Sequence, residues 1–271
     1  MSSSANEQDS RTWIVVSTCD SYGDAWQPFF DLMARYWPDC PYSVAVVTES
    51  HRLRESATSG IQNLRWIHLN HDHGWATNLR IALDQIGAES IVYLQEDYFL
   101  QRRVDTNRLR QTIQLARKEK AAYVRLPGRP EPTGTVSRKL RLGLLKPGTK
   151  FRCSLQSAWW DVAVLRQLLV EGETGWEMEI AGSRRSDRLE RPFWAAEPQA
   201  PLLDYYFHTA ILKGKWLPGA LALCRREGIF VDTSRRETHP AWLIPWREFR
   251  NSPAMKSVRR LWPRGSRKAA S

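Results

Sequence analysis

The stretch "WATNLRIALDQIGAESIVYLQED" (75–97) joins a helix pattern, a turn and a strand pattern without interruption. Its first half has apolar residues at helical spacing and ends at Gly87, a residue type that favours the end of a helix. Its second half, 90–96, is a run of strand-forming apolar residues that stops at two adjacent carboxylates, Glu96 and Asp97. A helix that leads into a buried strand in this way predicts a β-α-β unit and a parallel sheet.

The same alternation extends over the first 126 residues. Strand patterns lie at 12–18, 42–49, 64–69 and 121–126, and further helix patterns lie at 24–37, before Pro38, and at 105–119, with Asp105 as N-cap. We therefore predict an α/β fold with a mostly parallel sheet and helices on both faces. In such sheets the ligands bind beyond the carboxyl ends of the strands.

The second half of the chain is less regular. Residues 127–150 are rich in Pro, Gly, Arg and Lys and are expected to form a long loop. Helices are expected at 161–170 and near "TGWEMEIAG" (174–182). Because no linker or repeat is visible, we predict one domain over 11–240, between a disordered N-terminus (1–10) and a basic, Trp-containing tail (241–271).

The tail carries much of the net charge of +11, because it holds eight Lys or Arg residues and one Glu. It also holds Trp242, Trp246, Phe249 and Trp262. Basic residues among aromatic ones suit an anionic membrane surface. Nucleic acid, here the less favoured partner, and a merely solvated tail are the alternatives. No apolar run reaches 18 residues, and the four cysteines lack metal or disulfide spacing. We expect a cytoplasmic protein, peripheral on the inner face of the membrane.

Glu96 and Asp97 follow a buried strand, where the binding crevice is expected. Carboxylate oxygens are good ligands for Mg²⁺ or Mn²⁺, which proteins commonly bind together with substrate phosphates. The alternative is an ordinary solvated loop or helix cap. "HLNHDH" (68–73) brings three histidines together, but without the spacing of a zinc site.

The segment "NHDHGWATNLRIALDQIGAESIVYLQEDYFL" (70–100) resembles the GT-A-fold nucleotide-sugar glycosyltransferases, in particular bacterial family-2-like enzymes of polysaccharide assembly. Their Asp-x-Asp motif stands here as Gln95-Glu96-Asp97, without the first Asp, which weakens the case for metal dependence. Looser motifs follow in the family's order, in "SLQSAWWDVAVLRQLL" (154–169), "GWEMEIAGS" (175–183), "ILKGKW" (211–216) and "EGIFVDTSRR" (227–236). The resemblance covers most of 12–236 and implies a GT-A Rossmann-like sheet.

For the donor, the resemblance implies a nucleotide sugar held at the carboxyl edge of the sheet. Asp97, and Glu96 second, would bind a divalent Mg²⁺ or Mn²⁺ and through it the diphosphate. The other implied donor contacts are Thr18 or Asp20 to the base or ribose, Tyr22 by stacking, and Asn78 and Arg80 to phosphates or sugar. Asp24 or Ser21 could instead only cap the next helix, and Arg80 could be solvated. His208 is considered for an extra metal or diphosphate contact, with a core or surface role as the alternative. Arg225, Arg226, Arg235 and Arg236 are considered for closing over the diphosphate, with surface charge as the alternative.

For the acceptor, inverting transfer needs a general base within hydrogen-bond reach of the hydroxyl. Glu179 is the candidate and Glu177 the alternative, although a Glu in a first helical turn also favours the helix dipole. Trp176 would stack on the acceptor sugar, and the family's pattern places Gln156 and Trp159 in the acceptor site.

The predicted function is transfer of a sugar from a nucleoside-diphosphate donor to a saccharide or lipid-linked acceptor in surface polysaccharide assembly. A sugar nucleotidyltransferase is one alternative, but these enzymes commonly have a Gly-rich loop after the first strand, where this chain has only Gly23. A nucleic-acid-binding protein without enzymatic activity is another, and it leaves Glu96, Asp97 and Glu179 unexplained.

Overall fold

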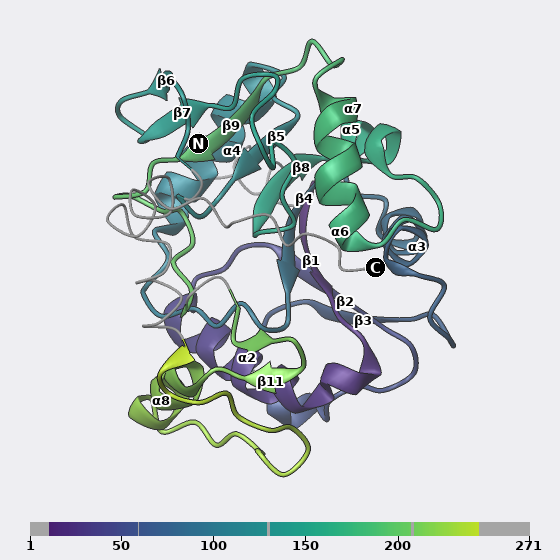
Figure 1. Ribbon diagram of the computed structural model, residues 1–271, viewed down its shortest axis with the longest axis vertical. Coiled ribbons are helices and arrows are strands. Elements are labelled where there is room, and N and C mark those ends of the chain that lie inside the picture. The colour runs from purple at the N-terminus through teal and green to yellow at the C-terminus, as the bar shows by residue number, and fades with distance from the viewer. Residues whose placement is uncertain (1–10, 59, 129–130, 207–208, 244–271) are drawn as a thin grey trace, which may run out of the picture.

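The computed structural model describes residues 11–58, 60–128, 131–206 and 209–243. One nine-stranded sheet runs through them in the order β3-β2-β1-β4-β8-β5-β9-β7-β6 (Figure 1). The strands are β1 (Thr12–Ser17), β2 (Ser43–Thr48), β3 (Leu64–His68), β4 (Ser90–Gln95), β5 (Tyr123–Arg125), β6 (Thr135–Ser137), β7 (Leu142–Leu144), β8 (Ala158–Asp161) and β9 (Phe193–Ala196).

The sheet has a parallel half and a mixed half. β3, β2, β1 and β4 pair in parallel, as predicted. β8 was not expected between β4 and β5, and it pairs antiparallel with both. β5 ends at the edge where β8 begins, since Arg125 is paired with Ala158. A parallel strand needs a crossover to the opposite edge, and the chain between β5 and β8 makes none. The predicted α/β fold with a mostly parallel sheet is confirmed.

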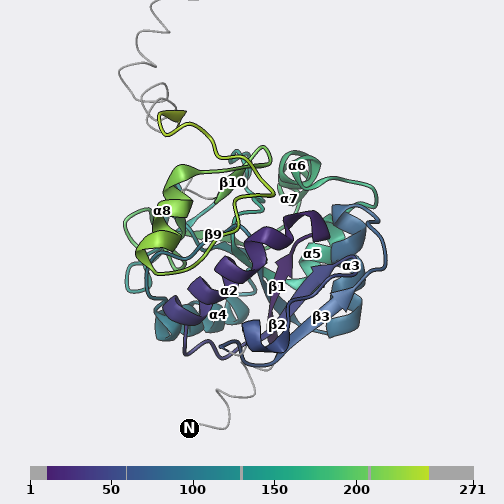
Figure 2. The same cartoon turned by 90° about the horizontal axis from the view of Figure 1, so that it is seen from below.

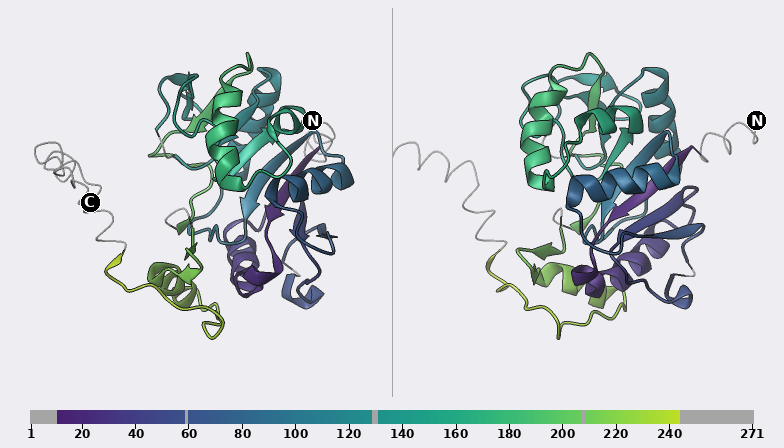
Figure 3. Two further views of the ribbon diagram at one scale, coloured as in Figure 1. Left: turned by 45° about the vertical axis from the view of Figure 1, so that its right-hand side comes forward. Right: turned by 90° about the vertical axis from the view of Figure 1, so that its right-hand side faces the viewer.

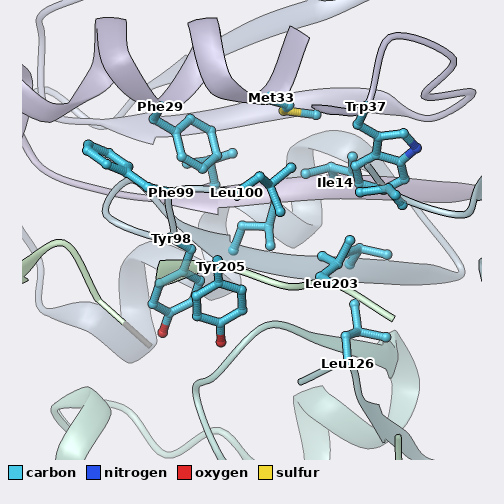
Figure 4. Close-up of a cluster of buried hydrophobic side chains, with 14 of the residues drawn as sticks. Ile14, Phe29, Met33, Trp37, Tyr98, Phe99, Leu100, Leu126, Leu203 and Tyr205 are labelled. Carbon is cyan, nitrogen blue, oxygen red and sulfur yellow. The ribbon is translucent and has the colours of Figure 1, made fainter. Parts of the chain in front are cut away.

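Helices cover both faces of the sheet, as predicted (Figure 2). α2 (Gly23–Tyr36), α4 (Thr106–Lys118) and α8 (Pro218–Arg226) pack with Ile14 and Val16 of β1 on one face. α3 (Trp75–Ile86) and α5 (Val162–Leu168) pack with Val15 on the other. Successive side chains of a strand point to opposite faces, so each buried strand supplies two cores. Figure 4 shows the first core, where Phe29 and Met33 of α2 lie over the sheet.

Two helix ends confirm the capping signals. Gly87 has φ 62° and its N–H donates to the carbonyl of Leu83 at 3.2 Å. Asp105 accepts a hydrogen bond from the N–H of Arg108 at 2.9 Å. The expectation of a structureless loop over 127–150 was wrong in part, because β6 and β7 form an antiparallel pair there. Each has three residues, which is too short to show a period in the sequence.

Shorter elements carry the loops around the sheet edge. They are η1 (Asp20–Tyr22), η2 (Glu55–Thr58), α6 (Gly175–Glu177), η3 (Met178–Gly182), α7 (Ser183–Ser186), β10 (Ile211–Leu212) and β11 (Lys215–Trp216). Trp216 exchanges backbone hydrogen bonds with Glu237 and His239, both at 2.8 Å, so the C-terminal segment returns beside β11 (Figure 3). Among the described residues no helix is long and apolar enough to cross a membrane. The expected N-terminal disorder and the tail residues Trp246, Phe249 and Trp262 lie outside the described part.

Candidate active site

Several chain segments meet at the carboxyl edge of the sheet. β1 and β4 end together there, since Ser17 is paired with Gln95. β5 ends and β8 begins at the same edge. The loops after these strands therefore bring together residues that are far apart in the sequence. The edge predicted to hold the site is the one where the acidic pair lies.

Glu96 and Asp97 are both buried, each only 7% exposed. The Asp97 carbonyl accepts from the N–H of Ala210 at 2.7 Å, and Asp97 Oδ2 accepts from the Thr209 hydroxyl. Asp97 Oδ1 is buried and has no hydrogen-bond partner among the described residues. Buried polar oxygens without a partner are uncommon in proteins. This oxygen is therefore the one in the pair that is available to a ligand.

Burial, and then the charge of Asp97, raise the pKa of Glu96 well above its ordinary value. Burial also raises the pKa of Asp97 to about 6, although the Thr209 hydroxyl lowers it. Two adjacent buried carboxylates do not both ionise readily without a cation. No group of three His, Cys, Asp or Glu side chains suited to a metal lies in the described part of the chain. The two carboxylates fit a divalent ion whose other ligands are phosphate and water, a common arrangement for Mg²⁺.

Arg236 reaches this site from the end of the described chain. Its guanidinium makes two 3.0 Å hydrogen bonds to the carboxylate of Asp24, which is 1% exposed, and it donates to the Ser21 carbonyl at 3.0 Å. It also lies over the Tyr22 ring, 4.5 Å from the centroid. Arg236 therefore secures the loop after β1, and its charge lowers the pKa of Glu96. It is this pairing, and not a helix cap, that the structure shows for Asp24.

The loop after β1 is tied to the loop after β2 through Asp20. Its carboxylate accepts from the Ser50 hydroxyl at 2.7 Å and from the His51 N–H at 3.2 Å. Burial acts to raise the pKa of Asp20, but these hydrogen bonds outweigh it and lower the pKa below its ordinary value. Thr18 Oγ1 accepts from Trp26 Nε1 at 2.8 Å. Asp20 is thus a connection between two loops, with its oxygens already engaged.

The loop after β3 is shaped by Asn78. Its side chain donates to Asp72 Oδ1 at 2.7 Å and accepts from the His73 N–H at 3.0 Å. Arg80 is exposed on α3. The rings of His71 and His73 lie 3.8 Å apart, without forming a metal site with other described residues. Among the late candidates, Arg225, Arg226 and Arg235 are exposed, and His208 lies outside the described residues.

Glu179 lies in η3, which is wound as a π-helix, a feature often found at functional sites. Its Oε1 accepts from the Ser154 hydroxyl at 2.9 Å and from the Leu155 N–H at 2.8 Å. No hydrogen bond to its Oε2 is found within the described ranges. Glu179 lines a pocket of about 550 Å³ together with Phe151 and Trp176. One oxygen is fixed and the other is available, which is the arrangement that a general base needs.

An aromatic pair forms one wall of this pocket. Trp176 is 63% exposed, and its ring centroid lies 6.0 Å from that of Phe151. Phe151 has φ 55°, which is strained for a bulky residue, and such strain clusters at functional sites. An exposed tryptophan beside a second ring offers a broad apolar surface for a sugar face.

Two of the other predicted residues have different surroundings. Glu177 is exposed and forms a capping box, since its carboxylate accepts from the Thr174 N–H at 2.8 Å and from the Thr174 hydroxyl at 2.9 Å. These hydrogen bonds lower its pKa. Trp159 is 1% exposed in β8, between β4 and β5. The prediction that Trp159 binds the acceptor was wrong, because its side chain packs in the core.

Tyr98 lies between the acidic pair and the pocket around Glu179. Its ring stacks on Tyr205 with centroids 4.6 Å apart (Figure 4), and Tyr205 donates to Gln156 Oε1 at 2.6 Å. Burial raises the pKa of Tyr98 well above its ordinary value, and the negative charges of Asp97 and Glu179 raise it further. The Tyr98 hydroxyl also donates to the Leu155 carbonyl at 2.7 Å, and the Leu155 N–H donates to Glu179 Oε1 at 2.8 Å. Tyr98 and Leu155 therefore link the acidic pair to the pocket around Glu179.

Arg125 lies next to the pocket around Glu179 and was not among the residues that the sequence analysis singled out. It is fully buried at the end of β5, and its guanidinium donates to the Phe151 carbonyl at 3.2 Å. Burial lowers its pKa, whereas the nearby charge of Glu179 raises it. An Arg at the end of an apolar strand, in "AAYVRL" (121–126), was the available signal. Thr209 was also missed, because it lies in an irregular segment with no pattern.

No protein-family model and no curated protein matches this chain. Solved structures similar to it include S. aureus TarS, a GT-A glycosyltransferase, as residues 1–349 in complex with UDP. That match has 12% identity, covers 69% of this chain and 60% of that one, and has a TM-score of 0.46. The chain spans 36% of the longer TarS structure, at 12% identity, 69% coverage of this chain and a TM-score of 0.43.

Two similar structures are cytidylyltransferase-type proteins. One is a cytidylyltransferase from Leptospira borgpetersenii serovar Hardjo-bovis, with 10% identity, coverage of 73% of this chain and 82% of that one, and a TM-score of 0.45. The other is CMP:2-keto-3-deoxy-manno-octonic acid synthetase complexed with CTP, with 12% identity, coverage of 69% and 89%, and a TM-score of 0.39. At these identities and TM-scores the likeness concerns only the general arrangement of strands and helices.

Proposed function

We propose that this protein is an inverting glycosyltransferase that moves a sugar from a nucleoside diphosphate to a saccharide or lipid-linked acceptor in surface polysaccharide assembly. One observation carries the proposal. Asp97 and Glu179 each have an oxygen without a hydrogen-bond partner in the described part of the chain, and Tyr98, next to Asp97, is linked to Glu179 through the carbonyl and N–H of Leu155. Glycosyl transfer needs both a site for the diphosphate, here assigned to Asp97, and a general base, here assigned to Glu179.

On the donor side, the loops after β1 and β2 would hold the nucleoside, with Tyr22 available for stacking beside Arg236. Asn78 shapes the neighbouring loop, and Arg80 is exposed on the helix that follows it. Glu96 and Asp97 would hold the divalent cation. Such an ion, when bound, neutralises the charge of the departing diphosphate.

On the acceptor side, the sugar would lie against Trp176 and Phe151, which leaves its hydroxyl close to Glu179. Glu179 would accept the proton on Oε2, because Oε1 is engaged by Ser154 and Leu155. Gln156 is held by Tyr205 and would orient the acceptor from the opposite side. Glu177 is engaged in its capping box, so Glu179 is the better candidate for the base.

A sugar nucleotidyltransferase fits the loop after β1 less well. Phosphate cradles of that kind use several glycines, because their backbone N–H groups must approach the phosphates closely. Here the segment that follows β1 has one glycine, Gly23, which begins α2. A nucleic-acid-binding protein would make no use of the buried pair Glu96 and Asp97.

The basic tail suggests where the acceptor comes from. Beyond Leu243 the chain has eight Lys or Arg residues and one Glu, interleaved with aromatic residues. Such a segment is attracted to anionic lipid at about 1 kcal/mol for each basic residue near the surface. We infer that the tail keeps the protein close to a lipid-linked acceptor.

The experiment compares Glu179→Gln with Glu177→Gln. Gln can still accept at Oε1, so Glu179→Gln should fold normally and bind the donor nucleotide. It should lose about 10²- to 10⁴-fold in transfer rate, measured as product formation and nucleoside diphosphate release. Glu177→Gln is the matched control and should keep its rate. Full transfer activity in Glu179→Gln would contradict the proposed base.

A further inference from the structure

An apolar surface lies on the loop that follows α8, at the end of the molecule opposite β6 and β7 (Figure 1). We call it the Phe230 surface. It lines a hollow of about 300 Å³ and consists of Leu221, Arg225, Ile229, Phe230, Val231 and Thr233. Phe230 is 82% exposed, more than any other large apolar side chain in the described part of the chain. An exposed aromatic side chain among aliphatic neighbours marks an interaction site.

The loop that carries Phe230 is fixed at its beginning. The N–H of Ile229 donates to the Cys224 carbonyl at 2.8 Å, which closes the end of α8. Glu227 Oε2 accepts from Arg35 at 2.9 Å, and Glu227 Oε1 accepts from Arg226 at 3.0 Å. The hydrogen bond of Ile229 turns the chain just before Phe230. The hydrogen bond from Arg35 to Glu227 ties this turn to α2. The exposure of Phe230 therefore belongs to an anchored loop.

The loop is also fixed at its other end, by Arg236. Its two hydrogen bonds to Asp24 are largely excluded from water, since the Arg236 side chain is 10% exposed. Five residues lie between Phe230 and Arg236, so their Cα atoms lie at most about 22 Å apart. Arg236 packs on Tyr22 in the proposed donor site. The Phe230 surface is thus held within a short distance of that site.

The charge around the Phe230 surface is mainly positive. Arg225 and Arg235 are exposed, and neither forms a salt bridge within the part of the chain that the structure describes. Between Phe230 and Arg236 the acidic residue is Asp232, whose carboxylate accepts from the Ser234 N–H at 2.9 Å and from the Ser234 hydroxyl. These hydrogen bonds, and then the charge of Arg235, lower the pKa of Asp232. In the sequence, the strongly basic segment 244–271 follows this loop. A partner for this surface should be both negatively charged and apolar.

We propose that the Phe230 surface inserts into the headgroup region of an anionic phospholipid bilayer. Aromatic and aliphatic side chains enter this region while neighbouring arginines contact the lipid phosphates. A second copy of this chain would oppose a net charge of +11 with the same charge, so it is the less suitable occupant. Nucleic acid would match the arginines but would leave Phe230 in water.

The role of membrane binding in sugar transfer rests on the proposed function. A bilayer bound at Phe230 would hold the donor loops within reach of a lipid-linked acceptor. The binding itself does not depend on transferase activity. Vesicle binding without transfer would refute the proposed function alone, and transfer without Phe230-dependent vesicle binding would refute this proposal alone.

The test is vesicle co-sedimentation of the full chain. The vesicles are phosphatidylglycerol mixed with phosphatidylcholine, compared with phosphatidylcholine alone. Phe230→Glu should weaken binding to the mixed vesicles by about tenfold or more, from the loss of one inserted aromatic and the addition of one negative charge. Val170→Glu is the matched control, because Val170 is also exposed, at 43%, after α5 on another part of the surface. It should bind like the wild type.

Both variants alter exposed side chains, so their melting temperatures should equal that of the wild type within about 2 °C. Equal binding by Phe230→Glu and the wild type would overturn the proposal. A second variant, Arg225→Glu with Arg235→Glu, should lose binding to the mixed vesicles. Duplex DNA can be added as a competitor. If it displaces the wild type and Phe230→Glu from the vesicles equally well, the basic surface would be assigned to nucleic acid and the proposal would be overturned.

Discussion

Because Asp97 is buried, its ionised carboxylate should destabilise the folded state above pH 6. Its pKa is raised by burial from an ordinary value of 3.8 to about 6, and the side chain is 7% exposed. One pKa unit corresponds to about 1.4 kcal/mol, so the shift corresponds to roughly 3 kcal/mol. A raised pKa means that the folded state binds the proton more tightly than the unfolded state. The stabilising contribution is therefore complete below pH 4 and is lost as the pH rises through about 6.

Asp97→Asn removes the ionisation and keeps a side chain that can hydrogen-bond to Thr209. At pH 8 its free energy of unfolding should exceed that of the wild type by up to about 3 kcal/mol, a rise of roughly 5 °C in melting temperature. Near pH 4 the two proteins should unfold together. The assay is calorimetric unfolding at both pH values. The same variant should lose transfer activity.

Asp39→Asn is the matched control, since Asp39 is exposed and makes a 3.4 Å salt bridge to Arg103. It should change stability by less than about 0.5 kcal/mol at either pH. If Asp97→Asn were less stable than the wild type at pH 8, or if the difference did not depend on pH, the reasoning about the buried pair would be wrong. Addition of Mn²⁺ at pH 8 should stabilise the wild type and leave Asp97→Asn unchanged.

Three further substitutions separate surface, core and buried-charge roles. Trp176→Ala should raise the KM for the acceptor by about tenfold and leave the melting temperature unchanged, because its side chain is 63% exposed. Trp159→Ala should instead destabilise the protein by about 3–5 kcal/mol in urea unfolding, as expected for a core residue; an unchanged midpoint would contradict its burial. Arg236→Met leaves the Asp24 carboxylate buried without its partner, so unfolding in urea should show a loss of about 3–5 kcal/mol. A midpoint equal to that of the wild type would refute the role assigned to this ion pair.

The elements with long periodic patterns could be predicted from the sequence. α3 and α4 begin and end within about two residues of the expected bounds, because Gly87 and Asp105 cap them. The four parallel strands were also expected, since each is a continuous apolar run and needs burial on both faces. Local chemistry decides such elements, and local chemistry is visible in the sequence.

The direction of β8 and the β6–β7 pair could not be predicted. The direction of a strand depends on the edge at which the chain re-enters the sheet. The residues "AWWD" (158–161) do not indicate that edge. The same strand explains the error about Trp159. A tryptophan in a short strand has the same sequence pattern whether its side chain is buried or contacts a sugar.

The candidate site was partly predictable for a similar reason. Glu96 and Asp97 follow a strand, so their position at the carboxyl edge could be inferred. Their partners could not, because Thr209 lies 112 residues from Asp97, and Arg236 lies 212 residues from Asp24. Such contacts are decided by packing across the whole domain, which periodicity along the chain does not record.

Binding of the nucleotide part of the donor is the most direct test of the proposed donor site. The measurement is thermal unfolding of the wild type and Asp97→Asn with UDP, GDP, CMP or dTDP, each with and without Mn²⁺. A ligand that binds the folded state raises the melting temperature. We expect one nucleotide to raise it in the wild type, with a larger rise when Mn²⁺ is present, and no Mn²⁺-dependent gain in Asp97→Asn. If no nucleotide at millimolar concentration raises the melting temperature, the protein is not a nucleotide-sugar transferase.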